Sequence, residues 1–183
     1  MNVDITLPDG SVRNYESPVT GYQIAESIGP RLLKDAICVE IDNKFQDLSF
    51  EISENINLRI VTTKDLDALH ILRHSSAHIL AQAVLNLYPN AQFGVGPSIE
   101  NGFYYDFLFE TPIKENELEE IEKEMKRIAK SSQSFIKSEI TKKEAVKIFK
   151  NQKLKLELIE SAESDEGVGE EIVSTYANDG FID

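Results

Sequence analysis

Three histidines recur every four residues in the stretch "LHILRHSSAHILAQAV", which spans residues 69–84. They are His70, His74 and His78, and the sequence has no other histidine. The ordinary pKa of imidazole lies near neutrality, so this side chain can bind a metal or exchange a proton at physiological pH. The spacing leaves three alternatives: core histidines, metal ligands, or groups that position and deprotonate water in a hydrolase.

Helical geometry places the three histidines on one side of a helix that we expect between residues 67 and 88. The same side carries apolar and small residues: Ile71, Ala77, Ala81 and Leu85. The opposite side is also apolar, which predicts a helix that is buried on both sides. Because a buried imidazole without a polar partner is costly, this pattern favours partners for the histidines.

A metal site would need further ligands beside the histidine pair. Histidines at positions i and i+4 suit bidentate binding, but no glutamate adjoins the first histidine as it does in zinc proteases. Asp106, Glu110 or Asp183 could supply an oxygen ligand, yet nothing in their spacing requires it. We therefore expect no metal, and neutral imidazoles that position or deprotonate water remain the other chemical alternative.

Composition indicates a globular chain of 183 residues, with 41% hydrophobic and 28% charged side chains. No apolar run reaches the roughly 18 residues of a membrane span, and the N-terminus does not resemble a secretory signal. The single cysteine, Cys38, fits a reducing compartment, so we expect a cytoplasmic protein.

The net charge of −13 argues against wrapping nucleic acid by bulk electrostatics. The charge is uneven, however, because residues 114–150 carry 10 basic and 8 acidic side chains. This stretch is the one candidate RNA-facing surface, although its alternating signs are more typical of a solvated helix.

The fold class predicted from these patterns is α+β in two parts. Residues 1–62 contain a hairpin around Pro8-Asp9-Gly10, a helix after Thr20 that stops at Gly29-Pro30, and strands at 36–42 and 56–62. This order suggests a small β-grasp domain.

Residues 63–183 form the second predicted domain, an α+β unit around the buried histidine helix. After that helix we expect an Asn101-Gly102 turn followed by an aromatic strand, and a helix that begins at Pro112. The apolar stripe of that helix consists of Leu118, Ile121, Met125 and Ile128. The further predicted elements are a helix capped by Thr141 and Glu144, a strand at 153–159, an acidic loop at 160–171 and a last hairpin that turns at 178–180.

Four motifs occur in the order found in the N-terminal half of bacterial threonyl-tRNA synthetases. They are "ITLPDGS", "ILRHSSAHILAQAV", "GVGPSIENGFYYDF" and "YANDGFID". The chain resembles that family over its whole length. The resemblance implies a TGS domain, which is a β-grasp module, followed by an editing domain that alanyl-tRNA synthetases share in outline.

The activity implied by this resemblance is hydrolysis of serine wrongly esterified to the threonine tRNA. A synthetic site that accepts threonine cannot fully reject serine, which lacks only a methyl group, so a second site must remove the error. The partner implied is therefore tRNA, at the acceptor end with its terminal adenosine. The alternative is a non-catalytic module that binds RNA or protein.

The family's HxxxH pair maps onto His74 and His78, and His70 falls outside the motif. Lys155 matches the family's strand lysine near the ester, where it would stabilise the oxyanion. Asp183 matches the aspartate that orients water or the substrate amine. Tyr104 and Tyr105 lie in the strand that resembles the pocket wall and are the expected substrate-binding residues, with a place in the core as the alternative.

The sequence departs from the family pattern after Asp183, where a "CxGPH" motif would complete the editing site. We therefore expect an editing domain truncated at its C-terminal end, with weak or no activity in this chain. The family's catalytic domain, which uses ATP and zinc, is absent, so we expect neither ligase activity nor a cofactor here. The full-length family is expected to form homodimers, whereas this segment is compatible with a monomer.

Overall fold

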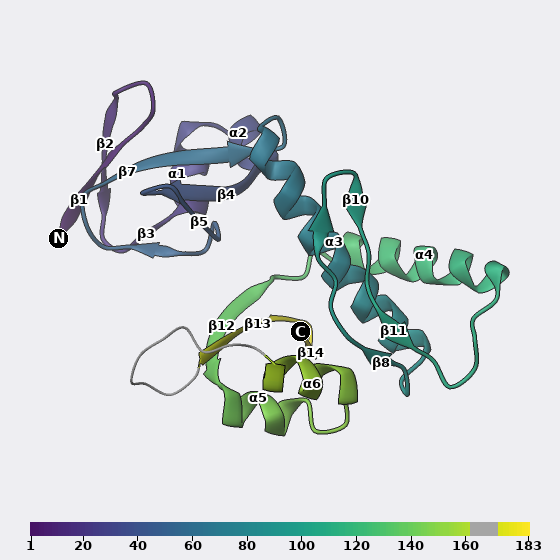
Figure 1. Cartoon of the computed structure of the whole chain (residues 1–183). Helices are drawn as coiled ribbons and strands as arrows, with labels where there is room; N and C mark the ends of the chain where they lie inside the picture. Colours follow the sequence, from purple (N-terminus) through teal and green to yellow (C-terminus); the bar gives the residue numbers. More distant parts are fainter. Residues whose placement is uncertain (162–171) are drawn as a thin grey trace. The chain divides into compact units, whose positions relative to one another are not determined.

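The computed structural model describes residues 1–161 and 172–183 (Figure 1). The chain divides into two compact units, Met1–Leu72 and Arg73–Asp183, which we describe separately. Nearly all of the predicted acidic loop at 160–171 lies outside the described residues. Among the described helices, none combines the length and apolarity needed to cross a membrane.

Unit 1 is built on a five-stranded mixed sheet with the strand order β2-β1-β7-β4-β5. These strands span Val12–Glu16, Asn2–Thr6, Ile56–Thr62, Ala36–Ile41 and Lys44–Gln46, in that order. β1 and β7 pair in parallel, and the other neighbours are antiparallel. A separate small sheet pairs β3 (Val19–Thr20) with β6 (Glu51–Ile52). The hairpin predicted around Pro8-Asp9-Gly10 is confirmed, with Gly10 in the left-handed region at φ 80°.

The helix predicted after Thr20 is α1 (Gly21–Ile28). The Thr20 hydroxyl accepts a hydrogen bond from the Gln23 backbone, and the Gln23 side chain accepts one from the Thr20 backbone. This reciprocal pair is a capping box, and it satisfies donors that the first turn leaves open. α1 ends before Gly29 as predicted, but α2 (Pro30–Asp35) follows at once because proline is well accommodated in a first helical turn.

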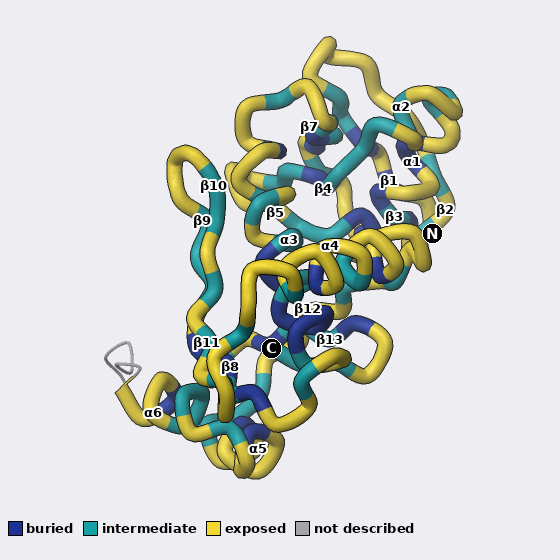
Figure 2. The backbone as a smooth tube through the Cα atoms, turned by 90° about the vertical axis from the view of Figure 1, so that its right-hand side faces the viewer, coloured by how far each residue is buried: buried dark blue, intermediate teal, exposed yellow. Residues whose placement is uncertain are grey.

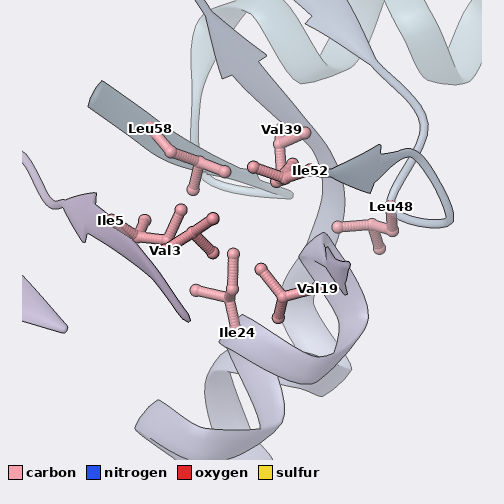
Figure 3. Close-up of a cluster of buried hydrophobic side chains, with 8 residues drawn as sticks. All are labelled: Val3, Ile5, Val19, Ile24, Val39, Leu48, Ile52 and Leu58. Carbon is pink, nitrogen blue, oxygen red and sulfur yellow. The ribbon is translucent and has the colours of Figure 1, made fainter. Parts of the chain in front are cut away.

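The core of unit 1 lies between α1 and the sheet, where apolar side chains from both point toward one another (Figure 3). Eight buried residues form this cluster: Val3, Ile5, Val19, Ile24, Val39, Leu48, Ile52 and Leu58. Val3 and Ile5 occupy alternate positions along β1, and Leu58 does so with the half-buried Ile56 and Ile60 along β7, so one face of the sheet is buried. This arrangement of a mixed sheet with one helix across it confirms the β-grasp prediction.

The histidine helix is α3 (Leu66–Leu87). The prediction that this helix is buried on both sides is wrong for its first half. Leu66 and Leu69 are exposed, whereas Ala77, His78 and residues 81–84 are buried (dark blue in Figure 2). The burial of the second half follows from Ala83 and Val84, which pack against α4 (Glu115–Lys130) through Ile121 and Ile128.

Four two-residue strands follow α3 in unit 2. Strand β9 (Ser98–Ile99) pairs with β10 (Gly102–Phe103), and β8 (Gln92–Phe93) pairs with β11 (Phe107–Leu108). The Asn101-Gly102 turn is confirmed, but the continuous aromatic strand is wrong. Residues 104–106 separate the two short pairs and are not in a strand, although the backbone of Asp106 still bonds to Gly94 and Val95.

Helix α4 begins at Glu115, so the predicted start at Pro112 is wrong. Lys114 is the N-cap residue, and its backbone N–H donates to the Glu117 carboxylate at 2.7 Å. An acidic residue in the first turn also opposes the positive helix end, which favours this start over the proline. Leu118, predicted in the apolar stripe, is exposed.

The C-terminal part of unit 2 is a three-stranded antiparallel sheet with the order β12-β13-β14 and two helices. Its elements are β12 (Ile136–Thr141), α5 (Lys142–Ile148), α6 (Lys153–Ser161), β13 (Ile172–Asn178) and β14 (Phe181–Ile182). The Thr141–Glu144 capping box and the last hairpin are confirmed. The strand predicted at 153–159 is wrong, because this stretch is α6. Its leucines, lysines and glutamate are strong helix formers, and Leu156 and Ile159 pack together with Phe149.

Candidate functional site

Two of the histidines meet on one face of α3, in unit 2. His78 is buried and His74 is exposed. Their Nε2 atoms lie 3.2 Å apart, and the rings meet edge to face with centroids 4.7 Å apart. Residues four apart on a helix are neighbours, so the HxxxH spacing alone dictates this contact.

Asp183 closes the other side of His78. Its backbone exchanges two hydrogen bonds with Tyr176 of β13, at 2.8 and 2.9 Å, which holds it beside the sheet. From there its Oδ2 lies 2.7 Å from Nδ1 of His78 and accepts a hydrogen bond of 2.7 Å from the Tyr105 hydroxyl. Its Oδ1 forms an ion pair with Lys155 of α6.

These contacts decide the charge of the Asp183 carboxyl. Burial by itself raises its pKa, but contact with His78 and the positive charge of Lys155 lower it to about 2. Asp183 is therefore an anion at neutral pH. Burial and the nearby Asp183 charge both raise the pKa of Tyr105, which keeps its hydroxyl protonated and able to donate.

Lys155 is held from three sides. Besides pairing with Asp183, its Nζ donates to the Tyr105 hydroxyl at 3.2 Å and lies 4.9 Å from the centre of the Phe93 ring. An aromatic face stabilises a cation, so Lys155 is oriented as well as neutralised. Gly96 makes room for this arrangement, because a Cβ there would lie 2.0 Å from the Tyr105 ring.

The two contacts of His78 together imply proton positions. A carboxylate oxygen 2.7 Å from Nδ1 of His78 favours a proton on that nitrogen, since two lone pairs would repel, although the contact does not have the angle of a hydrogen bond. With that proton in place, a neutral His78 accepts at Nε2, and Nε2 of His74 is then the donor of the contact between the rings. His74 is the exposed end of the chain of contacts Asp183–His78–His74.

Comparisons with known proteins identify the first part of the chain by a family model and relate the whole chain to one class of protein. Residues 3–62 match the TGS domain family. Over 183 residues, the chain is 46% identical to the threonine--tRNA ligase of Paraburkholderia phytofirmans, covering 99% of this chain and 28% of that protein. The corresponding ligase of Ralstonia nicotianae is 44% identical over the same shares. The chain corresponds in sequence to the N-terminal segment of bacterial threonine--tRNA ligases.

The chain thus spans about 28% of the length of the curated threonine--tRNA ligases that it matches. Of the site residues predicted from the resemblance to that family, the structure brings five together: His74, His78, Tyr105, Lys155 and Asp183. Lys155 reaches the cluster from a helix rather than from the predicted strand.

Tyr104 and His70 lie outside this cluster. Tyr104 is 47% exposed, and its neighbour Tyr105 supplies the buried hydroxyl. The alternative oxygen ligands Asp106 and Glu110 do not join the histidines, since residues 1–161 and 172–183 contain no group of three or more His, Cys, Asp or Glu side chains that could hold a metal ion.

Sequence reasoning missed three residues around the histidines. The ring of Tyr176 lies 5.4 Å from that of His78 and 6.2 Å from that of His74, centre to centre. Gln82 and Asn178 form a buried hydrogen bond one helical turn away from His78. A buried glutamine four residues after the HxxxH pair was the available signal, because its position on the histidine face follows from the helical repeat.

Within the candidate RNA-facing stretch, the basic side chains near the end of α4 pair with acidic side chains of the same helix. Lys123, Lys126 and Arg127 form ion pairs with Glu120, Glu122 and Glu124, respectively. The Glu122–Lys126 pair spans four residues of α4, and the Glu120–Lys123 and Glu124–Arg127 pairs span three. These exposed pairs fit the solvated helix that the alternating charges predict.

Proposed function

We propose that unit 2 is an editing site that hydrolyses the ester of serine wrongly attached to the threonine tRNA. The observation that carries the proposal is the chain of contacts from Asp183 through His78 to His74, which ends on an exposed imidazole. The similarity to threonine--tRNA ligases supplies the substrate class, and the tRNA is the proposed partner.

In this proposal His74 is the base and His78 positions it. Asp183 fixes the tautomer of His78, and His78 in turn leaves Nδ1 of His74 free of a proton. His74 then removes a proton from a water molecule that attacks the ester carbonyl. Such proton transfer by a positioned side chain typically contributes about 10²–10⁴-fold to a rate.

Lys155 would stabilise the negative charge that develops on the carbonyl oxygen. The ammonium group is already oriented by Asp183, Tyr105 and Phe93, so it would need little reorganisation during the reaction. The Asp183 anion, in contact with three donors, serves in this scheme mainly to orient them. The TGS domain of unit 1 is proposed to contribute to tRNA binding.

The test is hydrolysis of seryl-tRNA under single-turnover conditions, with the chain in excess over substrate, because the departure from the family pattern after Asp183 leads us to expect only weak activity that this format can still resolve. His74→Ala should lower the rate at least about 10²-fold while leaving tRNA binding unchanged. His70→Ala is the matched control, since it removes a histidine from the same helix. Equal rates for His74→Ala and the unchanged chain, with tRNA still bound, would favour the alternative of a non-catalytic binding module.

A further inference from the structure

We propose that Gln82 and Asn178 are positioning residues whose buried hydrogen bond sets the register between α3 and β13, and so holds Asp183 against His78. This inference rests on the proposed editing function for its role in catalysis. The part that can be measured without catalysis is which nitrogen of the His78 imidazole carries the proton.

The first step is the placement of both residues relative to the site. His74, His78 and Gln82 are spaced by four residues on α3, so they share one helix face. Tyr176 and Asn178 are two residues apart on β13, so their side chains leave the same face of the strand. The hydrogen bond between Gln82 and Asn178 therefore fixes how far β13 is shifted along α3, and with it the position of Tyr176 relative to His74 and His78.

The second step is the contact itself. The Asn178 amide donates to the Gln82 side-chain oxygen at 2.6 Å and to that of Gln133 at 3.2 Å. Asn178 is 1% exposed and Gln82 is 4% exposed, so water does not compete for this bond. Because a buried hydrogen bond is directional and costly to break, it allows little sliding of β13 along α3.

The third step connects the amide pair to Asp183. Tyr176, beside Asn178 on the strand, packs its ring against both imidazoles and binds the backbone of Asp183. Asp183 then contacts His78. The contacts thus run from Gln82 through β13 to Asp183 and back to α3 at His78, one helical turn before Gln82. Each contact limits the position of the next residue in this series.

Stability alone does not account for this polar pair. The Asn178 side-chain oxygen is buried without a hydrogen-bond partner among the residues that the structure describes. A buried acceptor in that state costs free energy, so an apolar pair of similar size would serve a core equally well or better. The two amides instead specify the register between α3 and β13, as a single buried asparagine specifies the register of a coiled coil.

The experiment reads the His78 imidazole directly in the full 183-residue chain labelled with ¹⁵N-histidine. Long-range ¹H–¹⁵N correlations distinguish a proton on Nδ1 from one on Nε2. The unchanged chain should show His78 protonated on Nδ1. Gln82→Met, which keeps the size but removes the acceptor, and Asn178→Leu should both lose this signature. Gln82→Glu, which retains an acceptor oxygen, should keep it.

Gln46→Met on β5 of unit 1 is the matched control for the glutamine substitution, and it should leave the His78 signals unchanged. Circular dichroism selects the variants that remain folded. His78 signals identical to those of the unchanged chain in either folded variant, Gln82→Met or Asn178→Leu, would overturn the proposal. Because no hydrolysis is measured, this result is independent of whether the chain edits seryl-tRNA.

Discussion

Replacing Asp183 by asparagine should destabilise unit 2 in a manner that depends on pH. The folded state holds the Asp183 pKa at about 2, against 3.8 for a free aspartate, chiefly because His78 and Lys155 outweigh the cost of burial. Since the folded value lies below the unfolded value, the anion contributes stability above about pH 4. That contribution disappears as the pH falls through about 2.

The magnitude follows from the same pKa values. A difference of this size between folded and unfolded states corresponds to about 2 kcal/mol of unfolding free energy at neutral pH. Asparagine keeps the shape of the side chain but cannot pair with Lys155, so Asp183→Asn should lose about this amount. At pH 2 the Asp183 carboxyl is about half protonated in the folded protein and almost fully protonated in the unfolded chain, so most of the contribution is lost and the two proteins should approach equal stability.

Urea unfolding at several pH values between 2 and 5, followed by circular dichroism, measures this difference. Carboxylates common to both proteins cancel when the two unfolding free energies are subtracted. Asp179→Asn, at an exposed turn four residues earlier, is the matched control. A stability loss in Asp183→Asn that stays constant over this pH range would refute the electrostatic reasoning, as would a loss of equal size and pH dependence in the control.

Three further substitutions test the packing and caps around the site and in unit 1. Gly96→Ala should displace the Tyr105 ring, costing about 1–3 kcal/mol in urea unfolding and most of any seryl-tRNA hydrolysis; unchanged values in both assays would contradict the close approach. Thr141→Ala should remove the cap of α5 and cost about 1 kcal/mol, whereas Thr141→Ser should retain most of it. Gly21→Ala would place a Cβ 2.6 Å from Val39 in unit 1, so its unfolding free energy should fall by about 1–3 kcal/mol, and an unchanged value would show that the core relaxes without cost.

Features set by neighbours along the chain were predictable from the sequence. The caps at Thr20 and Thr141 depend on residues three positions away, and the contact between His74 and His78 depends on the helical repeat. The β-grasp unit was also accessible, because its strands and turns each carry a local signal. In these cases the residues that form a structure lie within one or two turns of each other.

Features set by partners distant in sequence were not predictable from periodicity. The run that holds Lys155 alternates in hydrophobicity and also has good helix formers. The helix is favoured because Leu156 and Ile159 pack in a cluster that includes the distant Phe93 and Val173. The sequence likewise could not choose between Tyr104 and Tyr105. That choice depends on Gly96, whose missing side chain leaves room for the Tyr105 ring.

The site's assembly from distant segments has a consequence for the order of folding. Gln82 and Asn178 are separated by 96 residues, and Tyr105 and Asp183 by 78. A helix such as α3 forms in about a microsecond, whereas contacts across such separations require closure of long loops and are slower. During synthesis, α3 leaves the ribosome well before β13 and β14 exist. Its histidine face must therefore remain without its final partners until the last residues of this segment have been made.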